Sequence, residues 1–127
     1  MTRSVLVVED EPDVRFAIVT LLAGLGWEIV EAEDGERAIE LVRTGAFDAI
    51  VLDHKLPGMQ GMEVARTLRW GGYRGFIVIY SAYLTPSLEQ EATELGAWAV
   101  GKPDLDELLD LLTETLHSNG HTGSSAS

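Results

Sequence analysis

Acidic side chains follow two apolar runs in this chain of 127 residues. Val5–Val8 precedes Glu9 and Asp10, and Ala49–Leu52 precedes Asp53. If both runs are strands of one parallel sheet, their carboxyl ends meet at the edge where such sheets bind ligands. Carboxylates gathered there repel one another, and their oxygens are the ligands that a hard cation such as Mg²⁺ prefers. The spacing therefore predicts a metal site beside an aspartate that could attack a phosphoryl group.

A hydroxyl and an amine follow two later runs. Ser81 follows the apolar run Phe76–Tyr80, and Lys102 follows the short run Ala97–Gly101. At the same sheet edge, the lysine would neutralise phosphoryl oxygens and the serine would donate a hydrogen bond to another. The product of this chemistry would be an aspartyl phosphate at Asp53.

The segments between these runs have helical patterns. Apolar residues recur at helical spacing, with proline or capping residues at the starts and glycines at the ends. The predicted strands cover residues 5–8, 27–32, 49–53, 76–80 and 97–101, and the predicted helices about 12–24, 35–45, 61–71, 85–96 and 104–116. Strands that alternate with helices predict a doubly wound parallel α/β sheet. The pattern alone leaves the strand order open.

The composition predicts one domain. With 46% apolar residues the chain can bury a sizeable core. We expect the domain to span residues 1–117. Residues 118–127, composed mainly of Ser and Gly with Asn, His and Thr, are expected to form a disordered tail or the start of a linker.

The charge and the cysteine count exclude several classes of function. The net charge of −12, without a basic stripe, argues against direct nucleic-acid binding. The absence of cysteine excludes disulfides and thiolate metal sites and is compatible with a reducing cytoplasm. Four apolar residues before Glu9 are too few for a signal peptide or a membrane span, so we expect a soluble cytoplasmic protein.

Five motifs occur in order along the chain: Val7-Val8-Glu9-Asp10-Glu11, Leu52-Asp53 with His54–Gly61, Ser81-Ala82, Gly96-Ala97, and Lys102-Pro103. Together they resemble the receiver domain of two-component response regulators, over about residues 4–116. The resemblance implies a flavodoxin-like (βα)5 fold with strand order 2-1-3-4-5. It also implies a phosphohistidine donor on a sensor histidine kinase or phosphotransfer protein, and a conformational switch read by an output domain or downstream protein. Such a domain is a signalling module and not a metabolic enzyme, although it catalyses its own phosphotransfer and autodephosphorylation.

The resemblance also implies roles for single positions. Asp53 resembles the phosphoacceptor, Ser81 the switch hydroxyl, and Lys102 the lysine that pairs with the phosphoryl group. The implied Mg²⁺ ligands are Glu9, Asp10, Asp53 and the backbone carbonyl of Lys55. In the family the bond before the residue that corresponds to Pro103 is cis, which a sequence cannot show.

The chain departs from the family pattern around its fifth strand. Most members have an aromatic switch residue three positions before the lysine, where this chain has Ala99, and the segment from Ala97 to Lys102 is one residue short. Trp98 could be the displaced aromatic, although a tryptophan there is more typical of core. With Leu111 it could instead form an apolar patch for homodimers on the face of the fourth helix, fifth strand and fifth helix.

Positions that flank the acceptor bear on the lifetime of the phosphorylated state and on a possible base. Lys55 and Tyr83 stand where family members tune the attack of water, and we expect their bulk to shield Asp53. His54 follows the acceptor directly, and we expect a solvated histidine there and not a base.

Other readings remain. Asp53 alone could be a turn residue, and Glu9 and Asp10 could simply be the acidic start of a helix. A phosphohydrolase is disfavoured because Lys55 stands where such enzymes carry a second aspartate. A flavin-binding domain is disfavoured because the acids after the first strand would repel the phosphate. A receiver-like interaction module that works without phosphorylation is the main alternative, and the absence of the switch aromatic supports it.

Overall fold

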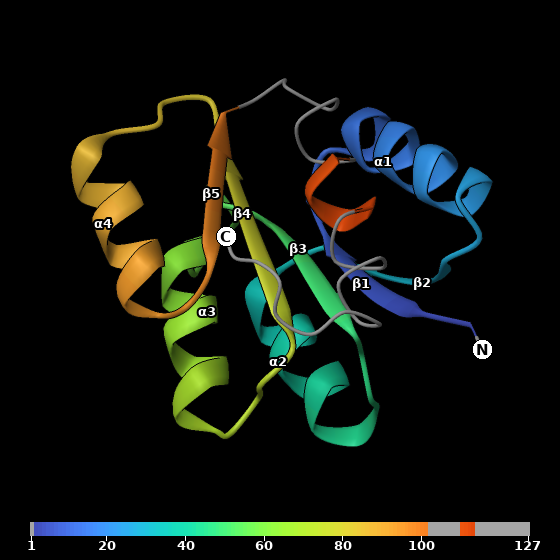
Figure 1. Ribbon diagram of the computed structural model, residues 1–127, viewed down its shortest axis with the longest axis horizontal. Helices are drawn as coiled ribbons and strands as arrows, with labels where there is room; N and C mark the ends of the chain where they lie inside the picture. The colour runs from blue at the N-terminus through green and yellow to red at the C-terminus, as the bar shows by residue number, and fades with distance from the viewer. Residues whose placement is uncertain (1, 102–109, 114–127) are drawn as a thin grey trace.

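Five parallel strands form one sheet in the order β2-β1-β3-β4-β5 (Figure 1). The computed structural model describes residues 2–101 and 110–113. The strands are β1 (Ser4–Val8), β2 (Glu28–Ala32), β3 (Ala49–Asp53), β4 (Phe76–Ser81) and β5 (Trp98–Gly101). The helices are α1 (Pro12–Gly24), α2 (Gly35–Thr44), α3 (Gly61–Trp70) and α4 (Pro86–Glu94), and residues 110–113 are also helical. The predicted doubly wound α/β fold with order 2-1-3-4-5 is confirmed.

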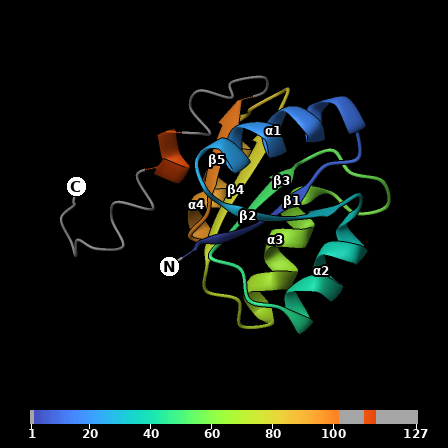
Figure 2. The same ribbon diagram turned by 90° about the vertical axis from the view of Figure 1, so that its right-hand side faces the viewer.

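Helices cover both faces of the sheet and create two core layers (Figure 1 and Figure 2). Alternate residues of each strand point to opposite faces, so Leu6 and Ile50 pack with α2, α3 and α4, while Val7 and Val51 pack with α1. Leu112 belongs to the second layer. This double burial explains why the central strands are continuous apolar runs.

The predicted helix starts agree with the caps in the structure. Asp34 Oδ1 accepts a hydrogen bond from the Arg37 N–H at 2.8 Å, and Thr85 Oγ accepts one from the Leu88 N–H at 3.1 Å. Pro12 is the first residue of α1. Proline, which has no backbone N–H, is tolerated there because an N–H at the first helical position has no partner within the helix. Among the described residues, no helix combines the length and the apolar character needed to cross a bilayer.

Some strand boundaries differ from the predictions, because the backbone N–H of the residue before the strand donates to a carbonyl of the preceding helix. Trp27 precedes β2, since its N–H donates to the Leu22 carbonyl at the end of α1, at 3.2 Å. Ala97 precedes β5, since its N–H donates to the Ala92 carbonyl of α4, at 2.8 Å. β4 continues through Ser81.

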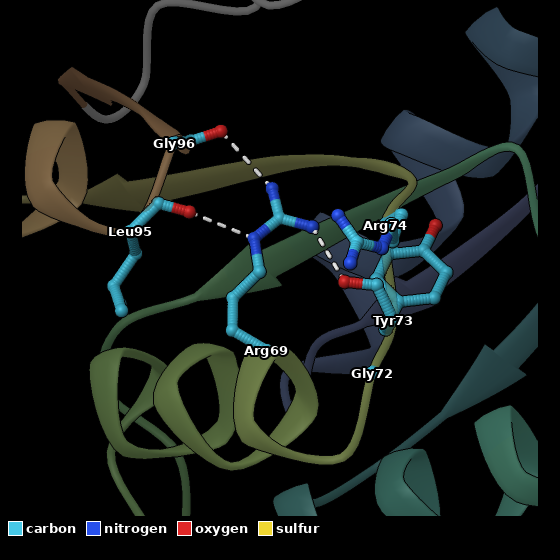
Figure 3. A pocket seen from close by; sticks show the side chains of 6 residues that line it. All are labelled: Arg69, Gly72, Tyr73, Arg74, Leu95 and Gly96. Atoms are coloured by element: carbon cyan, nitrogen blue, oxygen red, sulfur yellow. Dashed lines mark hydrogen bonds between the residues drawn. The ribbon is translucent and has the colours of Figure 1, made fainter.

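Arg69 ties the end of α3 to two turns on the side of the sheet opposite the carboxyl ends of the strands (Figure 3). Its Nε donates to the Leu95 carbonyl at 2.7 Å, and its Nη2 donates to the Gly96 carbonyl at 3.0 Å. Its Nη1 donates to the carbonyls of Tyr73 and Gly75 at 3.0 and 2.8 Å. A single guanidinium thus holds the entries to both β4 and β5.

Several predictions concern residues outside the described part of the chain. They are the role of Lys102, the bond before Pro103, the start of the last helix and the tail at 118–127. The domain boundary at residue 117 also falls there.

Candidate functional site

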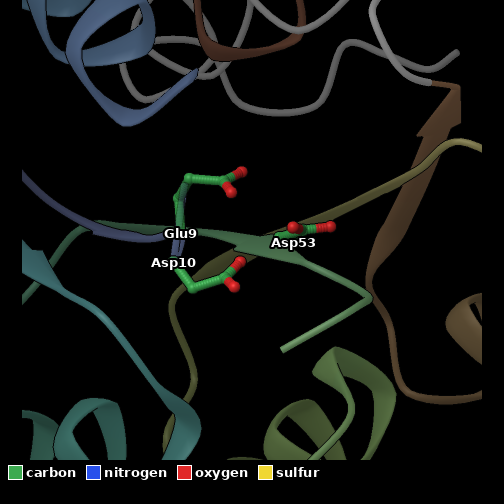
Figure 4. A group of neighbouring side chains, drawn as sticks. All are labelled: Glu9, Asp10 and Asp53. Carbon is green, nitrogen blue, oxygen red and sulfur yellow. The ribbon is translucent and has the colours of Figure 1, made fainter. Parts of the chain in front are cut away.

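Three carboxylates meet at the carboxyl edge of the sheet (Figure 4). Glu9 and Asp10 follow β1, and Asp53 is the last residue of β3, the neighbouring strand. One oxygen of each side chain lies within 4.8 Å of the other two. Glu9 is fully buried and Asp53 is 3% exposed, whereas Asp10 is exposed. The predicted convergence of acids from two segments far apart in sequence is therefore present.

Strand register explains why these side chains meet. β1 and β3 are parallel neighbours with Val8 opposite Leu52, so the next residues, Glu9 and Asp53, arrive at the same level. Glu9 continues the alternation of Val7, and Asp53 continues that of Val51, both of which face α1. The buried strand pattern therefore places both carboxylates on the same face of the sheet.

Hydrogen bonds orient the two buried carboxylates. Tyr80 Oη donates to Glu9 Oε1, and the Glu11 N–H donates to Glu9 Oε2 at 3.0 Å. The Lys55 N–H donates to Asp53 Oδ1 at 3.1 Å. The loops after both strands thus turn a backbone N–H back onto the acid.

The cluster concentrates negative charge. Two unit charges 4.8 Å apart repel by about 3 kcal/mol at an effective dielectric constant near 20. Arg15 contacts the backbone here, since its Nη1 donates to the Glu9 carbonyl at 2.7 Å, but its ion pair is with Glu31 at 3.0 Å, outside the cluster. An oxygen-only donor set of this kind fits a hard divalent cation.

The loop after Asp53 folds tightly onto the site. The His54 N–H donates to the Tyr80 carbonyl at 2.8 Å, and the Gly61 N–H donates to the His54 carbonyl at 2.7 Å. A Cβ at Gly61 would lie 2.4 Å from the Asp53 carbonyl oxygen, so only glycine allows α3 to begin this close to the acceptor strand. Gly58 has a φ of +82°, in the left-handed region.

Ser81 lies at the same edge, one residue beyond the pairing of Asp53 with Tyr80. It is 7% exposed. Its Oγ accepts a hydrogen bond from the Tyr83 N–H and donates one to the Tyr83 carbonyl, both at 3.2 Å. The hydroxyl is therefore near the predicted site but is bonded to its own loop.

Two aromatic side chains lie differently from the predictions. Trp98 is 51% exposed, so the prediction that it is core is wrong. It opens the edge strand β5 opposite Val78, and its ring centroid is 6.2 Å from that of Phe76, at the end of β4 remote from Ser81. The Tyr83 side chain is 83% exposed, which means that it does not lie buried over Asp53 in this conformation.

His54 contributes to the start of α3. Its Nδ1 accepts a hydrogen bond from the Met62 N–H at 3.4 Å, and the side chain is partly buried. The histidine that was expected to be solvated is thus only partly exposed, and its Nδ1 is engaged by the first turn of α3. Lys55 is exposed.

Sequence reasoning missed Tyr80, which it treated as the last apolar residue of a strand. Burial, and next the hydrogen bond to Glu9, raise the pKa of the Tyr80 hydroxyl far above its ordinary value, so it remains a proton donor. Strand alternation offered a signal, since Phe76, Val78 and Tyr80 share a face. A tyrosine at the carboxyl end of that series carries its hydroxyl toward the acids.

Comparisons with known proteins agree with this arrangement. The family model described as the response regulator receiver domain matches residues 5–113. The chain is 30% identical over 118 residues to sporulation initiation phosphotransferase F of Bacillus subtilis. This match covers 91% of this chain and 95% of the relative.

Two further similarities show the same family. The chain is 36% identical over 106 residues to the transcriptional regulatory protein DltR of Streptococcus agalactiae, covering 82% of this chain but 47% of that longer relative. The crystal structure of response regulator protein TrrA from Thermotoga maritima, in complex with Mg(2+)-BeF, superposes with a TM-score of 0.80 at 30% identity. That match covers 90% of this chain and 99% of TrrA. The chain therefore belongs to the response regulator receiver domain family of two-component signalling.

Proposed function

We propose that Asp53 accepts a phosphoryl group from a phosphohistidine on a sensor histidine kinase or phosphotransfer protein, in a Mg²⁺-dependent reaction. The observation that carries the proposal is the convergence of Glu9, Asp10 and Asp53 oxygens within 4.8 Å at the sheet edge. It is supported by the TrrA structure, which holds Mg(2+)-BeF, and by the phosphotransferase named among the relatives. The two readings of these acids as mere turn or helix-start residues explain neither the burial of Glu9 nor that of Asp53.

The proposed transfer uses Asp53 as the nucleophile. A carboxylate oxygen of Asp53 attacks phosphorus, the bond between phosphorus and the donor histidine nitrogen breaks, and the imidazole leaves with that electron pair. The Lys55 N–H, bonded to Oδ1, holds the carboxylate in one orientation. Glu9, Asp10, Asp53 and the Lys55 carbonyl would hold Mg²⁺, which supplies neutralisation of the phosphoryl oxygens.

Ser81 and Lys102 complete the proposed site. To reach a phosphoryl oxygen, the Ser81 hydroxyl must exchange its hydrogen bonds with Tyr83 for a new one. That exchange would couple phosphorylation to the loop after β4 and shift the population between two conformations. Lys102, outside the described residues, is proposed to pair with the phosphoryl group.

The remaining assignments extend this proposal. We infer a cytoplasmic signalling domain that does not contact nucleic acid directly, hydrolyses its own aspartyl phosphate, and acts on an output domain or downstream protein. Lys55 and Tyr83 are proposed to slow that hydrolysis. Trp98 remains the candidate for the displaced switch aromatic, and its exposure also supports the homodimer face around β5.

The test is phosphorylation by acetyl phosphate with Mg²⁺, followed by intact-protein mass spectrometry. We expect one phosphoryl group on the wild type, none on Asp53→Asn, and none on the wild type in EDTA. Asp34→Asn is the matched control, because asparagine also caps α2. A phosphorylated Asp53→Asn protein would refute the assignment. A wild type that binds Mg²⁺ but takes no phosphate would favour the phosphorylation-independent interaction module.

A further inference from the structure

Tyr80 brings a buried hydroxyl into the carboxylate cluster. The side chain is 3% exposed, and Tyr80 is paired directly opposite Asp53 in parallel register. Neighbouring residues in such register point to the same face, so the ring lies on the α1 face with the buried acids. Its hydroxyl donates a hydrogen bond to Glu9 Oε1.

Burial, the hydrogen bond to Glu9 and the nearby acidic charges together raise the pKa of the Tyr80 hydroxyl. Burial is the largest cause that raises its pKa, followed by the hydrogen bond to Glu9 and the charges of Glu9, Asp53 and Asp10. All three acids oppose ionisation of the phenol. The observed contact is a hydrogen bond that the hydroxyl donates to Glu9, at the place where three acidic side chains gather.

The contacts of Tyr80 connect three strand ends. Its backbone carbonyl accepts a hydrogen bond from the His54 N–H, next to Asp53, at 2.8 Å. Its side chain reaches across to Glu9, which follows β1. With the Glu11 N–H on Oε2 at 3.0 Å and Tyr80 on Oε1, both oxygens of the Glu9 carboxylate are held by donors from different segments.

We propose that Tyr80 is a positioning residue that fixes the Glu9 carboxylate and thereby sets the affinity of the cluster for Mg²⁺. The inference rests on the proposed function, since it takes Glu9 as part of the Mg²⁺ site. Partners that orient metal-binding carboxylates typically contribute 10- to 100-fold to metal affinity. Because a carboxylate oxygen has two lone pairs, Tyr80 and the ion do not compete for Glu9.

The experiment compares Tyr80→Phe with Tyr73→Phe. Tyr73 is the matched control, because its hydroxyl also donates a hydrogen bond within the protein, to the Phe47 carbonyl at 2.9 Å, but at the opposite end of the sheet. Mg²⁺ is titrated into each protein and followed by NMR shifts of the Glu11 and Lys55 amides, both bonded to cluster carboxylates. We expect the Mg²⁺ Kd to rise about tenfold in Tyr80→Phe and to stay unchanged in Tyr73→Phe.

Acetyl phosphate gives a second readout. Tyr80→Phe should need more Mg²⁺ for half-maximal phosphorylation but reach the wild-type rate at saturating Mg²⁺, a rescue that general structural damage would not show. In a Glu9→Gln background, Tyr80→Phe should change the Mg²⁺ Kd by less, because the two residues act through one contact.

The outcomes separate the two proposals. An unchanged or lower Mg²⁺ Kd in Tyr80→Phe, or a loss of rate that Mg²⁺ does not restore, would overturn the role of Tyr80. A wild-type protein that neither binds Mg²⁺ nor takes a phosphoryl group would instead overturn the proposed function.

Discussion

Asp10→Asn should make the protein more stable without Mg²⁺ while removing its response to Mg²⁺. Asp10 takes part in two of the three close carboxylate pairs, with oxygens within 4.8 Å. In the described part of the chain it has no hydrogen bond or ion pair that the substitution would break. The amide therefore removes repulsion and sacrifices no described contact.

The expected gain follows from distance and exposure. Each pair contributes about 3 kcal/mol at an effective dielectric constant near 20 and about 1 kcal/mol in water. Because Asp10 is exposed, the lower figure applies to its charge, and salt screens it further. We expect the free energy of unfolding to rise by about 1 to 2 kcal/mol, or a Tm higher by roughly 3–10 °C for a domain of this size.

Urea unfolding in EDTA at low ionic strength measures this gain, and repeating it with MgCl₂ measures the response to the ion. Glu28→Gln is the control, because it also removes one negative charge from the net charge of −12. It lies at the opposite end of the sheet, where Glu28 stands opposite Ser4 in the register of β1 and β2. If Asp10→Asn is no more stable than Glu28→Gln in EDTA, the reasoning from repulsion fails. If Mg²⁺ stabilises Asp10→Asn as much as the wild type, Asp10 is not a ligand.

Two further substitutions test the loops around the acceptor. Gly61→Ala should destabilise the protein by about 1 to 3 kcal/mol in urea unfolding, because its Cβ would lie 2.4 Å from the Asp53 carbonyl oxygen. The control Gly24→Ala should have little effect, because no atom lies within 4 Å of the added Cβ. Equal stability of the two variants would contradict the close approach at Gly61. Tyr83→Ala should shorten the lifetime of phosphorylated Asp53, measured by phosphate release after removal of acetyl phosphate, whereas an unchanged rate would show that the exposed ring does not shield the site.

Much of the fold and part of the site follow from local patterns in the chain. Apolar runs with acids at their ends, such as Val5–Asp10 and Ala49–Asp53, predict both buried strands and the edge at which their carboxylates meet. Caps at Asp34 and Thr85 locate helix starts, because they act within one turn of the backbone. The order of residues along the chain is enough to predict the acidic sheet edge, since parallel strands all have their carboxyl ends on one side of the sheet.

Features that depend on contacts between distant segments were decided by the tertiary structure. The sequence could not show that the Tyr80 hydroxyl meets Glu9, 71 positions away. It also misplaced Trp98, because exposure at the start of an edge strand depends on what packs beside it and not on residue type. Residue types and spacing therefore determined which groups reach the sheet edge, while strand register and packing decided which atoms hold one another there.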